Sequence, residues 1–535
     1  MIVRFGVFFD GTGNNQRNAI PAQANGGKGA SYSNALSNVA VLHALYPAEG
    51  ASADGSVAFL SRYVEGTGTL AGEADDTYAS ATGRGRTGVE ARVSEALEGI
   101  AKQLREWGQA HPQALLDGVE FDLFGFSRGA AAVRHLANLL HTDGGRLLAV
   151  PCGITINFIG LYDTVAAIIA PLRGDFDPAD DRHGGLRLGL EAGMARQWVQ
   201  LVAGDELRHN FPLVCSGHDI VLPGVHSNIG GGYPDFTQEQ VLLCKPQSQR
   251  VPSTMRADQT CVHAKVSGLL AAMSGGLGAR VITWEEPIAG GRPDEAQKQV
   301  YAAVYREREV AGQLSRVYLS VMRALAVRAG VPFGPLGGQA EHQVPDELVG
   351  ISRKLHDYAL GFSGEMGLTE QEQCLLRDRY VHTSANWNAL KGLRNSALDV
   401  LFVNRPGEGG AWCMRTRRPE LSTVRRTAAP TGLWVNSPQI FLILSQMAVQ
   451  LAASEISYDP RPLPTPVQWE PVSLGSIRRQ TTWRSGVVAR MHFFHDSLWR
   501  LCVGGFRACL DWKMPGSTTS RTVATHSRGS DSWRP

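Results

Sequence analysis

The chain has 535 residues, of which 43% are hydrophobic and 19% are charged, and its formal net charge is +2. That length exceeds one ordinary hydrophobic core, so we expect two or three domains. The small net charge gives no electrostatic basis for binding nucleic acid. The eight cysteines form no CxxC pair, so we expect reduced, buried thiols, no disulfide framework, no metal site and no cofactor.

The amino terminus shows no secretory leader, because its short apolar run leads straight into Asp10 and a glycine-rich loop. The longest apolar stretch, at 440–453, is too short to span a bilayer. That stretch and the Trp-bearing segment 493–512 are candidates for contact with a membrane surface, although core packing is the simpler interpretation. We expect a soluble chain that is made in the cytoplasm without a signal peptide.

Five apolar runs in the first half of the chain each end in a loop of small or polar residues. They are "IVRFGVFFDGTGNN", "VAFLSRYVEGTGT", "VEFDLFGFSRG", "ITINFIGLYDTV" and "DIVLPGVHSNIGGGY". Helical patterns lie between them at 33–45, 88–109, 130–140 and 194–202. This alternation predicts an α/β fold with a mainly parallel sheet and helices on both faces. In such sheets the loops at the carboxyl ends of the strands build the functional site.

The second half of the chain has a different pattern. Apolar residues at helical spacing predict one long helix over 295–330, followed by helices at 345–360 and 370–380. Glycine, proline, tryptophan and arginine dominate after residue 405, and the last residues are rich in Ser, Thr and Arg. We therefore divide the chain into a catalytic domain at 1–275, a helical region at 276–405, a C-terminal region at 406–515 and a disordered tail at 516–535.

A serine flanked by glycines follows the third apolar run, in Gly125-Phe126-Ser127-Arg128-Gly129. A tight turn from strand to helix requires small flanking residues, and it exposes the serine hydroxyl above the sheet. The amino end of the following helix then points its amides at the same place, which favours a developing negative charge. Because the pattern lies between an apolar strand and an Ala-rich helix, we interpret Ser127 as a nucleophile.

A serine hydroxyl needs a base, and the base needs an orienting carboxylate. His226 follows an apolar strand and precedes a glycine run, so it is the candidate base. Asp163 ends the fourth apolar run and is the favoured acid. Asp205 also lies between the serine and the histidine and remains the alternative, although a helical pattern precedes it.

The loop "FFDGTGNN" lies after the first strand, at the same predicted sheet edge. The backbone amides of Gly11 and Thr12 are candidates for one half of an oxyanion hole, and the amide of Arg128 is the candidate for the other half. Alternatively, Asp10 simply begins a local turn. The loop lacks the Gly-Lys-Ser/Thr ending of a phosphate-binding loop.

Taken in order, "FFDGTGNN", "YVEGTGT", "GFSRGAAAVR", "GLYDTVA", "DELRHNFPL" and "PGVHSNIGGGY" resemble the DUF2235 family. Within it the chain is most similar to Tle1-type phospholipase effectors of the bacterial type VI secretion system. The motif "RYVHTSANWN" at 379–388 is similar to that group too. The resemblance spans residues 3–235 and, more loosely, 370–405.

The resemblance implies an α/β-hydrolase-like domain with an added, mostly helical region. It also implies phospholipase A-type cleavage of membrane phospholipids in a target cell's envelope. The implied partners are a secretion spike or adaptor and an immunity protein. One departure is that Asn228 stands where the family commonly has Asp, before the glycine run. This departure favours an alternative, a non-catalytic binding module, and a cytosolic carboxylesterase is a further alternative.

Overall fold

The computed structural model describes residues 1–19, 29–168, 185–273, 278–288, 296–389 and 402–407. All of them belong to the first of two units, Met1–Gly432. The segments 440–453 and 493–512 and the tail at 516–535 lie outside the described residues, so the expectations for them stay predictions.

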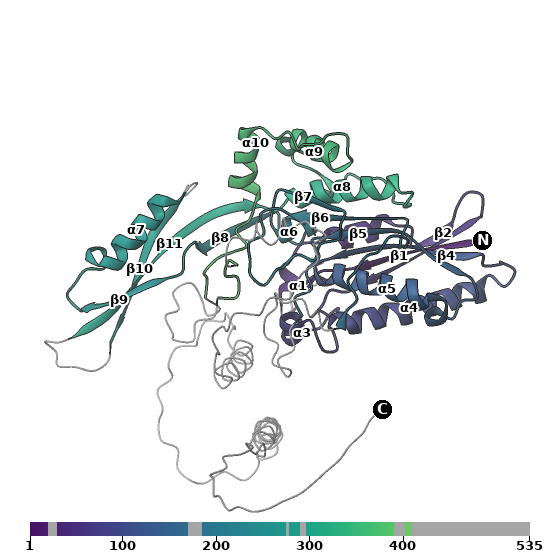
Figure 1. Ribbon diagram of the computed structural model, residues 1–535, viewed down its shortest axis with the longest axis horizontal. Helices are drawn as coiled ribbons and strands as arrows, with labels where there is room; N and C mark the ends of the chain where they lie inside the picture. Colours follow the sequence, from purple (N-terminus) through teal and green to yellow (C-terminus); the bar gives the residue numbers. More distant parts are fainter. Residues whose placement is uncertain (20–28, 169–184, 274–277, 289–295, 390–401, 408–535) are drawn as a thin grey trace, which may run out of the picture. The chain divides into compact units, whose positions relative to one another are not determined.

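A seven-stranded sheet in the order β2-β3-β1-β4-β5-β6-β7 forms the centre of this unit (Figure 1). Neighbouring strands pair in parallel, except that the short edge strand β2 runs antiparallel to β3. The strands are β1 Ile2–Phe9, β2 Glu49–Ala51, β3 Val57–Val64, β4 Gly118–Phe126, β5 Gly153–Tyr162, β6 Gln197–Ala203 and β7 Asp219–Leu222. The predicted α/β fold with a mainly parallel sheet is confirmed.

Helices cover both faces of this sheet, which explains why its strands are apolar throughout. One core joins the sheet to α4 and α5, and the other joins it to α2, α8 and α9. Figure 1 shows α4 and α5 on one side and α8 and α9 on the other. Apart from α7, Cys261–Ala272, the helices among the described residues are α1 Ala30–Ser33, α2 Asn38–Leu45, α3 Thr77–Thr82, α4 Val89–Ala110, α5 Arg128–Leu148, α6 His226–Gly230, α8 Leu314–Arg328, α9 Asp346–Ala359 and α10 Glu370–Leu375.

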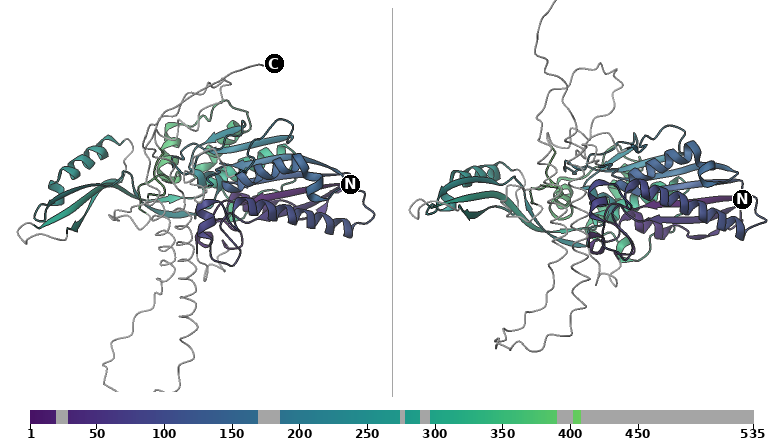
Figure 2. Two further views of the ribbon diagram at one scale, coloured as in Figure 1. Left: turned by 60° about the horizontal axis from the view of Figure 1, so that its bottom comes forward. Right: turned by 90° about the horizontal axis from the view of Figure 1, so that it is seen from below.

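A second, antiparallel sheet follows the first in the chain. Its strands are β8 Phe236–Leu242, β9 Gln247–Pro252, β10 Ala279–Pro287 and β11 Gln297–Ala311, and β11 pairs with each of the other three. Helix α7, Cys261–Ala272, packs along this sheet through Val262 and Val266 (Figure 2). Short turns of 3-10 helix lie at Ala257–Gln259 (η4) and Ala340–His342 (η6), and a π-helical turn lies at Leu376–Tyr380 (η7).

Two helix predictions are wrong. The pattern at 295–330 is split, because Gln297–Ala311 is strand β11 and only Leu314–Arg328 is helix. β11 is buried on both faces: Val300, Ala302 and Val304 face α7, whereas Ala303 and Tyr305 join another cluster. A strand that is buried on both faces lacks the alternation of apolar and polar residues by which a half-buried strand is identified. The segment 194–202 is likewise mostly the buried strand β6 rather than a helix.

The second sheet also bears on the domain division. Strands β8 and β9 precede residue 275, yet they pair with β11, which follows it. The boundary expected at 275 therefore falls inside one sheet. The added region is helical in α8, α9 and α10 but also contributes β10 and β11.

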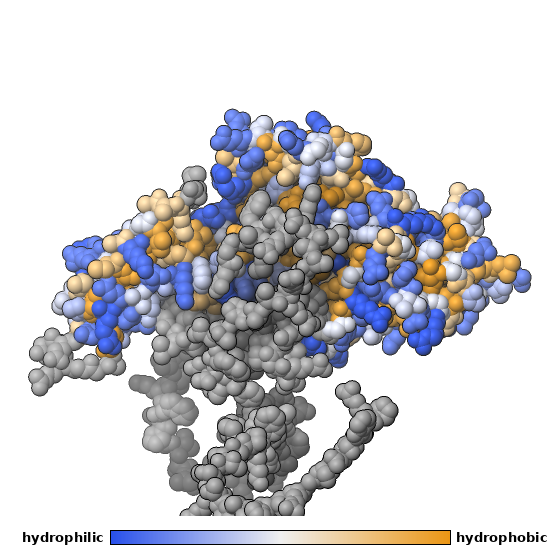
Figure 3. Space-filling view, viewed as in Figure 1, coloured by the Kyte–Doolittle hydropathy of each residue, from blue (hydrophilic) through white to orange (hydrophobic). Residues whose placement is uncertain are grey.

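The surface seen in Figure 3 mixes hydrophilic and hydrophobic residues. Among the described residues, the most exposed large apolar side chains are Leu115, Phe236 and Phe362, which lie in three separate parts of the chain. None of the described helices is long and apolar enough to cross a membrane. The five cysteines in the described ranges are free thiols, but none of them is buried as expected: Cys215 and Cys261 are exposed, and Cys152, Cys244 and Cys374 are half-buried.

Candidate active site

Ser127 occupies the sharp turn between β4 and α5, with φ of 58° and ψ of −125°. This backbone conformation is strained for a residue with a side chain. The flanking glycines are required by space. A Cβ atom on Gly125 would lie 2.6 Å from the carbonyl oxygen of Gly129, and a Cβ on Gly129 would lie 2.3 Å from the carbonyl oxygen of Asp10. The strand, the strained serine and the helix match the geometry expected of a nucleophile elbow.

Asp163 lies beside this turn because β4 and β5 are parallel neighbours whose register pairs Phe126 with Tyr162. The amide of Ser127 donates to the carbonyl oxygen of Tyr162 at 3.0 Å. Asp163 is fully buried and also has a positive φ, of 40°. Its Oδ1 accepts a hydrogen bond from the amide of Ala203 at 3.0 Å. Its carboxylate is therefore fixed between the ends of β5 and β6.

His226 is the first residue of α6, and its Nδ1 lies 2.7 Å from Oδ2 of Asp163. The imidazole also contacts the aromatic ring of Phe126, the residue before Ser127, at a centroid separation of 4.6 Å. The structure contains no hydrogen bond between the Ser127 hydroxyl and His226 within the described residues. Such bonds are often long in enzymes without substrate. The structure thus brings Ser127, Asp163 and His226 to one edge of the parallel sheet.

The protonation of His226 follows from its surroundings. Burial lowers the pKa of His226 below its usual 6.5, and the hydrogen bond and charge of Asp163 act in the opposite direction. The imidazole is therefore neutral at pH 7. Donation from Nδ1 to Asp163 places the proton on that nitrogen and leaves Nε2 as a hydrogen-bond acceptor. This is the tautomer that a general base needs.

Asp205, the alternative acid, contacts the loop before His226 rather than its ring. It follows strand β6, not the helix that the sequence pattern indicated. Its Oδ2 accepts from the amide of Gly224 at 2.6 Å, and its own amide donates to the carbonyl oxygen of Gly224 at 3.0 Å. Burial raises the pKa of Asp205. The contact with the imidazole belongs to Asp163 instead.

The loop after β1 is held by Asp10, which is buried. Its Oδ1 accepts from the amide of Gly11 at 2.7 Å, and its Oδ2 accepts from the hydroxyl of Tyr63 at 2.6 Å. The Gly11 amide thus already donates a hydrogen bond to Asp10, so its role as an oxyanion donor stays a prediction. The alternative interpretation, a turn closed by the Asp10 side chain, fits Gly11.

Thr12 and Arg128 are joined through their side chains. Nε of Arg128 donates to Oγ1 of Thr12 at 2.8 Å. The guanidinium also donates to the carbonyl oxygens of Ala79, at 3.4 Å, and Ser80 in helix α3. Burial lowers the pKa of Arg128 to about 10, which still leaves it charged at neutral pH. Among the described residues, the backbone amides of Thr12 and Arg128 have no hydrogen-bond acceptor, unlike that of Gly11.

Asn228 faces away from the His226 side chain and binds the motif at 379–388. Its Oδ1 accepts from the amides of Val225, at 3.2 Å, and His382, at 3.3 Å. Its Nδ2 donates to the carbonyl oxygen of Tyr380 at 3.0 Å and to Nδ1 of His382 at 3.1 Å. An amide suits this position because it can face two backbone donors with its oxygen and two acceptors with its nitrogen.

His382 is buried in a non-helical segment, and its ring stacks on Tyr233 at 3.6 Å between centroids. Burial lowers the pKa of His382 to about 4. Its Nδ1 and its backbone amide both bond to the side chain of Asn228. Within the described residues, the hydrogen bonds of the Asn228 side chain go to Val225, Tyr380 and His382 and not to Asp163 or the ring of His226.

Sequence reasoning missed Glu206, a fully buried carboxylate that contacts the amide of His226. The adjacent Asp205 was the alternative acid because it lies between the serine and the histidine in the chain. The only sequence signal for Glu206 was its place two residues before Arg208, and surface ion pairs share that spacing.

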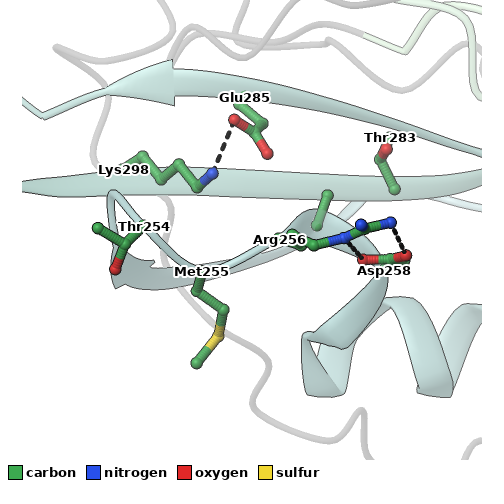
Figure 4. A pocket seen from close by; sticks show the side chains of 8 residues that line it. Thr254, Met255, Arg256, Asp258, Thr283, Glu285 and Lys298 are labelled. Atoms are coloured by element: carbon green, nitrogen blue, oxygen red, sulfur yellow. Dashed lines mark hydrogen bonds and ion pairs between the residues drawn. The ribbon is translucent and has the colours of Figure 1, made fainter.

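A separate hollow of about 390 Å³ lies on the antiparallel sheet (Figure 4). Its charged side chains pair with each other: Arg256 faces Asp258, and Lys298 faces Glu285. None of the candidate site residues lines it. In the described ranges, no group of three or more His, Cys, Asp or Glu side chains is placed to hold a metal ion.

The fold and this site define a protein of α/β-hydrolase-like architecture. A solved structure of the Tle1 effector bound to the VgrG spike of the type VI secretion system matches it with a TM-score of 0.60 and 27% identity, over 76% of this chain and 92% of that chain. An uncharacterised protein from Pseudomonas aeruginosa matches with a TM-score of 0.35 and 20% identity, over 70% of this chain and 52% of that chain.

No family model and no curated protein matches the sequence. The resemblance to DUF2235 therefore stays a resemblance, whereas the similarity to a Tle1 effector extends over most of the described fold.

Proposed function

We propose that this chain is a serine hydrolase that cleaves fatty-acyl ester bonds of phospholipids, in the manner of a phospholipase A. The observation that carries the proposal is the strained Ser127 at a strand-to-helix turn, beside the buried hydrogen bond between Asp163 and His226. The structural similarity to the Tle1 effector supports a role as an effector of a type VI secretion system.

The chemistry would proceed in two acyl-transfer steps. Oγ of Ser127 attacks the ester carbonyl carbon while Nε2 of His226 accepts the hydroxyl proton. His226 then gives that proton to the departing lysophospholipid oxygen, which leaves an acyl group on the serine. Water, deprotonated by His226, releases the fatty acid and restores the serine. Asp163 holds the imidazole in the required tautomer and stabilises its charged form.

The negative charge that develops on the carbonyl oxygen needs donors in both steps. We assign this role to the backbone amides of Thr12 and Arg128. One such donor typically changes kcat by about 100-fold to 1,000-fold. The bond between Nε of Arg128 and Oγ1 of Thr12 fixes the two segments that carry these amides relative to each other.

The alternative of a non-catalytic binding module was favoured by Asn228. The hydrogen bonds of Asn228 to Val225, Tyr380 and His382 explain an amide at this position without a loss of catalysis. The small-ester alternative, a cytosolic carboxylesterase, is left to the experiment.

The test is fatty-acid release from vesicles of long-chain phosphatidylethanolamine and phosphatidylglycerol, by the wild type and by Ser127→Ala. We expect the rate of fatty-acid release to fall by at least about 1,000-fold in the variant, because alanine has no hydroxyl to attack the ester. Equal rates for the two proteins would end the catalytic assignment. A parallel assay with a short-chain ester separates the alternatives, since a strong preference for that ester would favour the carboxylesterase.

Delivery is a separate part of the proposal. The similar Tle1 structure is bound to a VgrG spike, so we propose a spike protein as the carrier. We also propose an immunity protein as the inhibitor in the producing cell, which the resemblance to Tle1-type effectors implies. Purified chain mixed with VgrG proteins should elute as a complex in size-exclusion chromatography. Separate elution from every VgrG of the producing strain would contradict direct loading on a spike.

A further inference from the structure

The loop after β6 contains a buried ion pair that the reaction scheme does not use. Glu206 is fully buried, and its two carboxylate oxygens bind Arg208 side by side, with Nε at 2.9 Å from Oε1 and Nη2 at 2.9 Å from Oε2. The amide of Arg208 donates to Oε1 as well, at 2.9 Å. A two-pronged pair of this kind fixes both side chains in one geometry.

The pair contacts His226 from two directions. Oε2 of Glu206 accepts a hydrogen bond from the backbone amide of His226 at 3.2 Å. The guanidinium of Arg208 stacks 3.3 Å above the ring of Phe211, and that ring meets the imidazole edge-on at a centroid separation of 4.8 Å. The carboxylate of Glu206 therefore holds the start of α6, and the guanidinium of Arg208 holds the ring of Phe211 against the imidazole of His226.

A later part of the chain holds the pair in place. The hydroxyl of Ser384 donates to Oε1 of Glu206 at 2.9 Å. The amide of His209 donates to the carbonyl oxygen of Arg405, and the amide of Gly407 donates to that of Leu207. Segments about 180 residues apart, by the separation between Glu206 and Ser384, thus meet at this ion pair.

We propose that Glu206 and Arg208 form a positioning pair that sets both the orientation and the charge environment of His226. Neither residue touches the reacting atoms. The catalytic consequence rests on the proposed function, whereas the effect on His226 does not.

Three charged groups face His226 in the described structure: Asp163 from the end of β5, and Glu206 and Arg208 from the loop after β6. The two carboxylates favour the charged imidazole and Arg208 opposes it. Because the pair has no net charge when intact, removing either member leaves the other uncompensated next to the imidazole. Removing Glu206 and removing Arg208 must therefore shift the pKa of His226 in opposite directions.

The experiment compares Glu206→Gln with Arg208→Gln. We follow the imidazole of His226 by NMR titration of protein labelled in histidine, in a Ser127→Ala background, and identify its signal by comparison with Ser127→Ala/His226→Gln. Glu206→Gln leaves the arginine charge alone, so the pKa of His226 should fall. Arg208→Gln leaves the carboxylate alone, so the pKa should rise. Each shift should be about one pH unit.

The acid limb of kcat/KM against pH in the active protein should move in the same directions. The double variant Glu206→Gln/Arg208→Gln should return the titration close to that of the parent protein. Glu206→Asp keeps the negative charge but shortens the side chain, so it tests the geometry. It should lower kcat, and it should shift the pKa of His226 less than Glu206→Gln or Arg208→Gln does. Glu372→Gln breaks a comparable but more exposed pair with Lys354 and should leave the titration in place.

Opposite shifts would support the positioning pair. Shifts of the same sign, or no shift in either folded variant, would overturn it. If a single variant fails to fold, the double variant and Glu206→Asp decide the matter, because they leave no isolated buried charge. The NMR result does not depend on activity. A failure of the lipase assay would therefore remove the proposed function and leave this inference to be judged by the titration alone.

Discussion

Two loop regions of this chain differ in how far their charged side chains are exposed. The loops at the carboxyl edge of the parallel sheet carry Asp163 and Glu206, both fully buried and each held by several hydrogen bonds. In the segment between β9 and α7, the side chains of Arg256 and Asp258 are 74% and 51% exposed although they are paired. Parallel strands end at one edge, so their end loops converge and bury polar groups together. The antiparallel sheet itself also holds a buried pair, since the side chains of Arg308 and Glu239 are 16% and 9% exposed.

The largest effect should come from the buried carboxylate of the parallel sheet. Asp163→Asn keeps the size of the side chain but allows it to donate to Nδ1 of His226, which favours the wrong tautomer. We expect kcat to fall by about 10,000-fold, as such a change does in serine proteases. Rates on phospholipid vesicles measure this. Asp205→Asn is the matched variant, and a larger loss there than in Asp163→Asn would reverse the assignment of the acid.

A smaller effect should follow from separating the two loops that carry the proposed oxyanion donors. Thr12→Val preserves the shape of the side chain but removes the acceptor for Nε of Arg128. We expect kcat to fall about tenfold with little change in KM, which is less than the loss of a donor itself. Thr12→Ser keeps the hydroxyl and should retain most of the activity. A pure KM effect in Thr12→Val would assign the pair to substrate binding instead.

Asn228→Asp should alter stability rather than chemistry. A carboxylate there would face the carbonyl oxygen of Tyr380, which now accepts from the amide, so we expect a loss of about 1–3 kcal/mol at pH 8. The pKa of His382, about 4 in the wild type, should rise beside the new charge.

The wild type therefore loses stability as the pH falls from about 6.5 toward 4, because the unfolded chain binds the proton of His382 more readily than the folded protein does. The variant should lose less over that range. Urea unfolding at pH 8 and at pH 5 should show that the wild type and Asn228→Asp differ less in free energy of unfolding at pH 5. A constant difference would mean that His382 does not respond to residue 228.

The smallest effect should come from the antiparallel sheet. Glu285→Gln removes the partner of Lys298, whose Nζ lies 2.9 Å away, from a pair in which the glutamate side chain is 41% exposed. Exposed pairs contribute little, so we expect a change below about 0.5 kcal/mol in the free energy of unfolding and no change in kcat. A loss of activity here would show that the second sheet takes part in the reaction.

Local sequence determined the parallel half of the molecule. The small flanks of Ser127 follow from steric limits that act within a few residues, and the apolar runs of β1, β4 and β5 follow from burial between two helical layers. Because both are local, the places of β1, β3, β4, β5 and β7 and of Asp163 and His226 beside strand ends were predictable, whereas β6 was mistaken for a helix.

Only the tertiary structure decided the rest. The strand nature of β11, the use of the Gly11 amide by Asp10, and the partners of Asn228 and Glu206 depend on contacts between residues far apart in the chain. A buried strand and a buried helix can carry the same apolar residues. The position of a carboxylate in the sequence likewise does not determine which hydrogen-bond donor will lie beside it. Those choices are made by packing, since a buried polar group must take whichever partner the fold brings within reach.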